Sequence, residues 1–378
     1  MWLEIFKDHV RLCHYPRFFK ACQSVSFPKN LRYQSFHFKI GRRIRTGGFC
    51  MSVAPVEELF TVFNETAMII QEELACTYLE ALAETGENIF QGSILQKDEL
   101  SELTIKRLTK SYDSIHLNRF SNEEIRKSFQ LAILKGMKEI VQPNHQMTPD
   151  AVGMLLGYLV GKFVQDQSFR LLDPAVGTGN LLTTVINQQQ SKAVEAIGLD
   201  IDDILIKLSY VNANLQQHPI QFFNQDSLEP LFIEEADVVV SDLPIGYYPN
   251  DLRAADYEMK AEKGHTYAHH LFIEQSMRHV KAGGYLFFIV PNGIFESEQA
   301  PKLHEYLKNY GIIQGLLQLP LSLFKNKNAA KSIFIIQKKG EGVKPPKQVL
   351  LVNLPSLSKT AEVEKILSKI DGWYKENK

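Results

Sequence analysis

The stretch Asp173-Pro174-Ala175-Val176-Gly177-Thr178-Gly179-Asn180-Leu181-Leu182 decides the fold. It follows a short apolar run at 169–172 and leads into a segment with helical character, so it predicts a strand, a glycine turn and a helix. Gly177 and Gly179 allow a tight turn that brings peptide N–H groups against a ligand, and the helix N-terminus adds a partial positive charge. Taken alone, the turn leaves two interpretations open, a nucleotide-like cofactor site and an ordinary glycine turn.

Three further apolar runs each end on an acidic residue. They span 193–199, 220–224 and 236–240, and the acidic residues that follow them are Asp200, Asp226 and Asp242. In an open α/β sheet, ligands bind outside the carboxyl ends of the strands, so we expect these side chains and Asp173 to share one edge. Asp200 ends the strand after the glycine turn, where an acidic residue can accept both ribose hydroxyls of an adenosine. The spacing therefore favours the cofactor interpretation.

The ordered set of motifs resembles a known family, the class I S-adenosylmethionine-dependent N6-adenine DNA methyltransferases. Within it, the sequence is most similar to the methylation subunit of type I restriction systems and to YtxK-like proteins. The motifs are 173–179, Gly198-Leu199-Asp200-Ile201-Asp202, Asp226, the proline-containing turn opened by Asp242, the upstream Met147-Thr148-Pro149, and the later segments 270–274, 283–291, 319–320 and 332–335. The resemblance covers roughly residues 55 to 355.

The resemblance implies a fold, a cofactor and a set of site residues. The fold is α/β, a class I methyltransferase Rossmann-like seven-stranded mixed sheet in the order 3-2-1-4-5-7-6, with helices on both faces and an N-terminal helical domain. The cofactor is S-adenosyl-L-methionine. The implied cofactor-binding residues are Thr148, Pro149, Asp173, Pro174, Ala175, Gly177, Gly179, Asp200, Ile201, Asp226 and Ser227. The implied catalytic residues are Asp242, Leu243, Pro244 and Tyr247.

The chemistry expected of Asp242 follows from the weak nucleophilicity of an adenine amine. Its lone pair is delocalised into the ring until both hydrogens are held by acceptors, here the Asp242 carboxylate and the Leu243 carbonyl. Positioning then carries the rate of in-line methyl transfer, and no metal is required. His265, His269 and His270 have no partners at usual zinc spacing, so they predict a helix start lining the cleft rather than a metal site.

The turn departs from the family pattern of Asn or Asp, Pro, Pro, then Phe or Tyr. Leu243 replaces the first proline, and Ile245 replaces the aromatic residue on which an extruded base would stack. Tyr247 or Tyr248 could supply that ring instead. Three functions therefore stay open: methylation of adenine in DNA or other nucleic acid, methylation of a protein side-chain amide, and cofactor binding without turnover. The polar segment 250–266 is a candidate lid.

The sequence predicts three parts: a non-native or disordered extension at 1–50, an N-terminal helical domain at 51–144 and the methyltransferase domain at 145–378. Residues 1–50 hold ten Lys or Arg and two Asp or Glu and show no sustained periodicity. Because Gly47-Gly48-Phe49-Cys50-Met51 can be encoded as a ribosome-binding site before a start codon, we expect translation to begin at Met51. The alternative is a basic arm that recruits nucleic acid. Helical patterns at 56–83, 98–108 and 122–141 form the helical domain, with Ser121 and Glu124 at capping-box spacing.

Charge and composition bear on partners and compartment. Residues 51–378 hold 32 basic and 41 acidic residues, which predicts weak unaided binding of nucleic acid and leaves room for a specificity partner or a homodimer. No apolar run approaches the 18 or so residues of a membrane span. Four cysteines without a C-x-x-C pair indicate a reducing, cytoplasmic setting.

Overall fold

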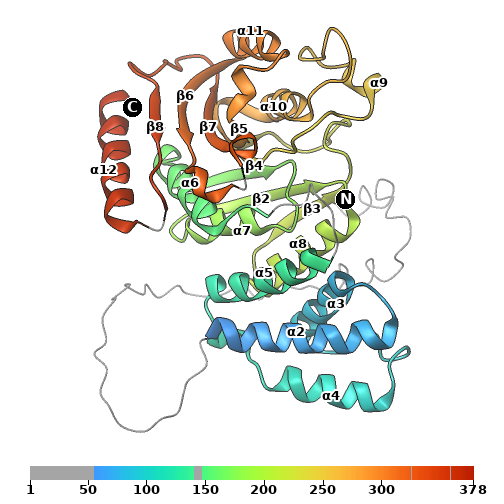
Figure 1. Ribbon diagram of the computed structural model, residues 1–378. Helices are drawn as coiled ribbons and strands as arrows, with labels where there is room; N and C mark the ends of the chain where they lie inside the picture. The colour runs from blue at the N-terminus through green and yellow to red at the C-terminus, as the bar shows by residue number, and fades with distance from the viewer. Residues whose placement is uncertain (1–54, 140–146, 325, 358) are drawn as a thin grey trace, which may run out of the picture. The chain divides into compact units, whose positions relative to one another are not determined.

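One mixed β-sheet forms the centre of the computed structural model, which describes residues 55–139, 147–324, 326–357 and 359–378 (Figure 1). The extension expected at 1–50 and the start expected at Met51 lie outside the described residues. Within them the sheet has eight strands in the order β3-β2-β1-β4-β5-β7-β6-β8. The strands are β1 (Ser168–Asp173), β2 (Ala193–Asp200), β3 (Ile220–Asn224), β4 (Ala236–Asp242), β5 (Val280–Pro291), β6 (Gly311–Gln318), β7 (Lys331–Lys338) and β8 (Leu350–Asn353).

The predicted order is confirmed for the first seven strands, and the count of seven is low by one. The additional strand β8 pairs parallel with β6 and adds an edge to the sheet. It is formed by the short segment Leu350–Asn353. Strand β7 runs antiparallel to β5 and β6, while β1 to β5 are mutually parallel neighbours.

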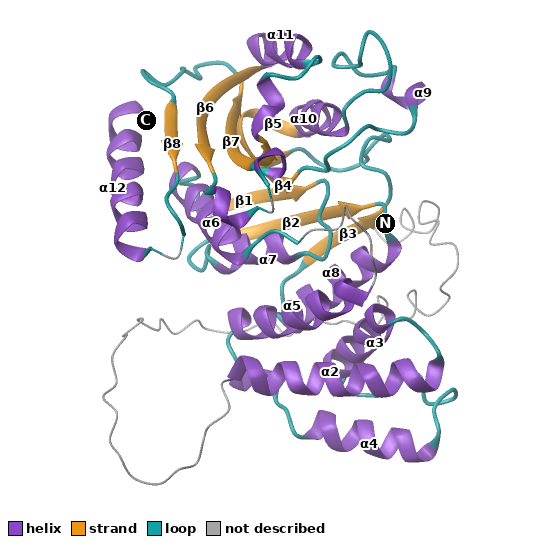
Figure 2. Ribbon diagram, viewed as in Figure 1, coloured by secondary structure: helices purple, strands orange, loops and turns teal. Residues whose placement is uncertain are grey.

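Helices cover both faces of the sheet because its strands are apolar on both sides (Figure 2). Leu171, Val238 and Phe287 pack with α6 (Asp150–Phe163), α7 (Asn180–Asn187) and α12 (Thr360–Asn377). Their strand neighbours Leu172, Val239 and Leu286 pack on the opposite face with α10 (Ala268–His279) and α11 (Ala300–Tyr310). The short helix α9 (Asp251–Ala254) follows β4. This arrangement leaves the strand ends as the accessible edges.

The N-terminal helices are α2 (Pro55–Leu74), α3 (Tyr78–Gln91), α4 (Glu102–Asp113) and α5 (Asn122–Glu139). Ala75, at a φ of 50°, ends α2, and Thr77 and Glu80 form a capping box that starts α3, so the pattern at 56–83 is two helices. The capping box predicted at Ser121 and Glu124 is confirmed: each backbone N–H donates to the other's side chain, at 2.8 and 3.3 Å.

The helical part packs onto the sheet part through α8 (Asp203–Leu215). Leu208, Val211 and Leu215 of that helix belong to the apolar cluster formed by α2, α3 and α5. Gly86 of α3 permits the approach, because an added Cβ there would lie 2.3 Å from a methyl group of Val211. In the described part of the chain no helix is both long and apolar enough to span a membrane.

Candidate functional site

The carboxyl ends of four adjacent strands bring the predicted aspartates to one edge. Asp173, Asp200 and Asp242 are the last residues of β1, β2 and β4, and Asp226 lies two residues after β3. Parallel pairing in the order β3-β2-β1-β4 aligns these ends. The edge is therefore strongly acidic, and its chemistry depends on what each carboxylate already contacts.

The glycine turn is held open by backbone geometry and by Asp200. Gly177 and Gly179 adopt positive φ values of 54° and 73°, which side chains other than glycine rarely tolerate. An added Cβ at Gly179 would lie 3.0 Å from Cβ of Ser209, whereas one at Gly177 meets no atom within 4 Å. The N–H of Gly177 donates to Oδ2 of Asp200 at 2.8 Å. The turn thus packs closely against α8 and presents Gly177 to open space.

Asp200 also accepts the N–H of Asp202 on Oδ1 at 3.0 Å, so each of its two oxygens accepts a backbone N–H. Beside it, the Ile201 side chain is 70% exposed. An exposed apolar side chain thus lies next to a carboxylate that accepts hydrogen bonds. This combination fits a ligand with a flat apolar ring at one end and hydroxyl groups at the other.

Asp173 is buried at the centre of the edge. Its Oδ1 accepts from the Ser241 hydroxyl at 2.8 Å and from the Ala175 N–H at 3.1 Å. Burial, together with the charges of Asp200 and Asp242, raises the pKa of Asp173 to about 7, although these hydrogen bonds lower it in part. A cationic group placed beside this carboxyl would favour its ionised form.

Asp226 and Ser227 connect the glycine turn after β1 to the turn after β4. The Tyr248 hydroxyl donates to Oδ2 of Asp226 at 2.6 Å, and the Ser227 hydroxyl donates to the carbonyl of buried Pro174 at 2.5 Å. Ser227 is therefore committed to holding the glycine turn through its side chain. Tyr248 is buried and bonded, so it does not supply the missing aromatic ring.

Asp242 is held from both sides. The Thr148 hydroxyl donates to its Oδ2 at 2.9 Å, and the Lys331 ammonium lies 2.6 Å from its Oδ1. Pro149 precedes α6 and is exposed, so the Thr148-Pro149 element reaches the edge at the mouth of that helix. The side chains of Asp242 and Lys331 are 17% and 16% exposed, so the ion pair is largely shielded from solvent.

Sequence reasoning missed Lys331, although a signal was present. Because β7 runs antiparallel to β5, its first residue pairs with Pro291, the last residue of β5, and so lies at the carboxyl edge of the parallel strands. A lysine directly before the motif segment 332–335 therefore lies at this edge of the mixed sheet.

The turn after β4 compensates in part for its unusual sequence. Leu243 is buried, and its N–H donates to the Ile289 carbonyl at 3.2 Å, a bond that proline cannot make. Pro244 is half-buried, and Ile245 is 47% exposed. Tyr247 is 55% exposed and stacks on Tyr267, with ring centroids 4.9 Å apart and an interplanar angle of 10°. Tyr247, which follows Asp242 closely in sequence, is therefore one ring of a stacked aromatic pair.

The histidines and the polar segment after the turn are packed into the fold. Burial lowers the pKa of His269 to about 4 and, with the charge of His269, that of His270 to about 3. Among the described residues no group of three or more His, Cys, Asp or Glu could hold a metal ion. In the expected lid, Met259 is buried and the Tyr257 hydroxyl donates to the Leu228 carbonyl at 2.7 Å. The segment 250–266 is thus anchored at its middle.

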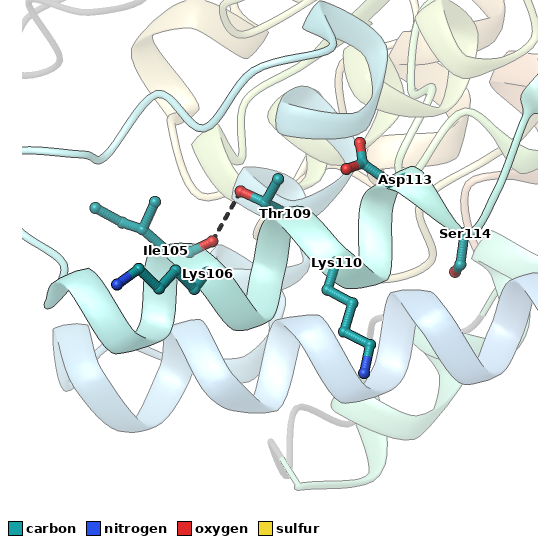
Figure 3. Close-up of a pocket in the computed structure, with 6 residues that line it drawn as sticks. All are labelled: Ile105, Lys106, Thr109, Lys110, Asp113 and Ser114. Carbon is teal, nitrogen blue, oxygen red and sulfur yellow. Dashed lines mark hydrogen bonds between the residues drawn. The ribbon is translucent and has the colours of Figure 1, made fainter.

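A separate shallow pocket lies on α4 and is unrelated to this edge (Figure 3). Its lining residues are Ile105, Lys106, Thr109, Lys110, Asp113 and Ser114. The Thr109 hydroxyl already donates to the Ile105 carbonyl at 2.8 Å, an ordinary intrahelical bond. Its lining comes from one helix and the turn after it, and none of the residues predicted for the site lies in it.

The strand order, the glycine turn and the acidic carboxyl edge together define a class I methyltransferase fold. Comparison with family models is specific: the N-6 DNA methylase model matches residues 144–373, and the model of the YtxK N-terminal helical domain matches residues 57–137. The chain therefore belongs to the N-6 DNA methylase family and carries a YtxK-type helical domain.

Relatives agree with this assignment. The uncharacterized protein YtxK of Bacillus subtilis (strain 168) is 48% identical over 324 residues, which cover 85% of this chain and 98% of that protein. A solved structure from Listeria monocytogenes, provisionally assigned to the class I S-adenosylmethionine-dependent methyltransferases, is 49% identical with a TM-score of 0.79, covering 85% of this chain and 99% of the other. The type I restriction-modification methyltransferase subunit of Streptococcus thermophilus shares the fold at 17% identity and a TM-score of 0.60, covering 85% and 76%.

Proposed function

We propose that this protein is an S-adenosyl-L-methionine-dependent methyltransferase that acts on the N6 amine of adenine in DNA or another nucleic acid. The observation that carries the proposal is the Asp242 carboxylate, fixed between Thr148 and Lys331 at the end of β4. It lies at the same edge as the glycine turn of β1. Membership of the N-6 DNA methylase family supports the reaction type.

The residues present fit the cofactor. Asp200 ends β2 beside the glycine turn, where its carboxylate would accept ribose hydroxyls, and exposed Ile201 offers an apolar surface to the adenine ring. Asp173 would face the cationic methionine end, together with Thr148 and Pro149. The remaining proposed contacts are Pro174, Ala175, Gly177, Gly179, Asp226 and Ser227. When bound, the cofactor supplies a sulfonium methyl group, which is the electrophile of the reaction.

The protein groups act on the amine. The Asp242 carboxylate would accept one N–H of the amine and the Leu243 carbonyl the other, so the nitrogen lone pair is withdrawn from the aromatic ring and directed at the methyl carbon. Methyl transfer to the nitrogen would leave the electron pair of the broken bond with the cofactor. The nitrogen then holds one proton too many, and the Asp242 carboxylate is placed to accept it.

The aromatic pair supports a base as the substrate. Tyr247 presents an exposed ring whose orientation is fixed by stacking on Tyr267, and Pro244 stiffens the turn between Asp242 and that ring. Stacking of an extruded base on such a ring contributes about 1 to 3 kcal/mol. The excess of acidic over basic residues in 51–378 leads us to propose that nucleic-acid binding needs a specificity partner or a second copy of the chain. A cytoplasmic substrate suits this proposal.

Transfer of an isotope-labelled methyl group into fractionated extract tests the proposal. The extract comes from a strain that lacks the protein, so that its natural target is unmethylated, and DNA, RNA and protein are counted separately. Label in DNA or RNA as N6-methyladenine is the expected result. Label in protein would instead indicate a side-chain amide, for which the same two acceptors would serve. Intact cofactor binding with no label in any fraction would indicate a binding protein without turnover.

A further inference from the structure

Arg126 of α5 is the largest side chain in the described residues that is fully buried. A buried guanidinium is costly unless its five N–H groups are all paired, and here all five are. It makes a bidentate pair with Glu123 at 2.6 and 2.9 Å and another with Asp150 at 3.1 and 3.1 Å. The fifth bond goes to Oδ1 of Asn180 at 2.5 Å. Such complete pairing fixes all three acceptors relative to α5.

Two of these acceptors begin the helices that border the cofactor edge. Asp150 is the first residue of α6, directly after Thr148-Pro149, and Asn180 is the first residue of α7, directly after Gly179. Burial raises the pKa of the Asp150 carboxyl, but the hydrogen bonds and charge of Arg126 outweigh it and hold that pKa below its usual range. The Arg126 side chain of the helical domain therefore binds the first residue of both α6 and α7.

The same network continues to the reacting group. The Asn180 side-chain amide donates to the Thr148 carbonyl at 3.3 Å, and the Thr148 hydroxyl donates to Asp242. Asn187, near the end of α7, donates to Glu123 at 3.1 Å and so closes the network on α5. A chain of contacts thus runs from Arg126 through Asn180, directly after the glycine turn, and Thr148 to Asp242.

We propose that Arg126 is a positioning residue for the cofactor pocket. Through it, the helical domain holds the segments that line the pocket in place. The inference deepens the proposed function and rests on it for the identity of the ligand. Loss of the guanidinium fork should let the 148–150 and 177–182 segments move independently, which weakens cofactor binding even in a fully folded protein.

The test compares Arg126→Lys with Lys207→Gln. Lys207 of α8 pairs with Glu84 of α3, so this ion pair also links the helical part to the sheet part, but it involves neither Asp150 nor Asn180. S-adenosylmethionine affinity is measured by calorimetry, and folding by circular dichroism. We expect Arg126→Lys to bind about tenfold more weakly and Lys207→Gln to bind as wild type. Asn180→Ala, which removes one acceptor of Arg126 and the bond to the Thr148 carbonyl, should weaken binding in the same direction and provides a variant if Arg126→Lys does not fold.

Amide hydrogen exchange separates this inference from the proposed function, because it needs no ligand. In Arg126→Lys, exchange at 177–182 should accelerate relative to both wild type and Lys207→Gln. Unchanged exchange there, or an equal loss of affinity in the Lys207 control, would overturn the role of Arg126. Failure of the wild-type protein to bind S-adenosylmethionine would instead contradict the proposed function while the exchange result still decides the inference.

Discussion

The Lys331 ammonium lies 2.6 Å from Oδ1 of Asp242, and the Thr148 hydroxyl holds Oδ2 of the same carboxylate at 2.9 Å. Since both neighbours donate, the carboxylate cannot rotate without breaking one bond. The arrangement leaves a lone pair on each oxygen and compensates a charge that would otherwise add to those of Asp173 and Asp200.

Lys331→Met should lower the rate of methyl transfer about tenfold, because a mispositioned acceptor loses much of its effect on the amine. Cofactor affinity should stay near that of wild type, and Lys331→Arg should restore part of the rate because it keeps the charge. The rate constant and the affinity are measured by single-turnover transfer and calorimetry. A Lys331→Met protein faster than wild type would show that the ion pair blocks the substrate instead of positioning its acceptor.

Asp200→Ala should weaken S-adenosylmethionine binding by about 1.5 to 3 kcal/mol, through loss of hydrogen bonds to a charged acceptor. The same change releases the Gly177 N–H, so the turn loses a support as well. Calorimetry against Asp203→Ala, an exposed aspartate of the same segment, provides the comparison. Equal affinities of the two variants would show that Asp200 does not bind the cofactor.

Asp173 should make stability depend on pH. Its pKa is about 7 in the folded protein against an ordinary value of 3.8, so the folded state binds the proton more tightly than the unfolded state. This group's contribution to stability is therefore present below pH 4 and is lost as pH rises to about 7, by at most about 4 kcal/mol. Urea unfolding measures the free energy of unfolding of wild type and Asp173→Asn. The difference between the two proteins should change with pH over this range. A constant difference from pH 4 to 8 would show that the carboxyl is ionised throughout.

Tyr247→Ala should lower kcat/KM for a nucleic-acid substrate. The loss of transition-state stabilisation should be about 1 to 3 kcal/mol, the usual contribution of stacking a base on an aromatic ring. Tyr247→Phe keeps the ring and should behave as wild type. Cofactor affinity should be unaffected in both. If Tyr247→Ala retains full kcat/KM, the exposed ring has no part in holding the substrate.

Periodicity and motif spacing predict the first four strands, because each is a short apolar run that ends on an aspartate or is closely followed by one. The order of the first seven strands follows from the resemblance to class I methyltransferases. The capping box at Ser121 and the acidic edge follow from local sequence. The network of Arg126 does not, because its acceptors are 24 and 54 residues away along the chain. The choice between Tyr247 and Tyr248 also depends on packing: one is exposed and stacked, and the other is buried against Asp226.

The most direct test of the central claim is product analysis with purified protein, deuterium-labelled S-adenosylmethionine and unmethylated DNA or RNA. Wild type and Asp242→Ala are compared at equal cofactor occupancy, established first by calorimetry. Labelled N6-methyladenine formed by wild type, and at least about a hundredfold less by Asp242→Ala at unchanged cofactor affinity, is the result predicted for a group that acts on the reacting amine. Equal product from both proteins, or product in neither nucleic acid while labelled protein accumulates, would contradict the claim.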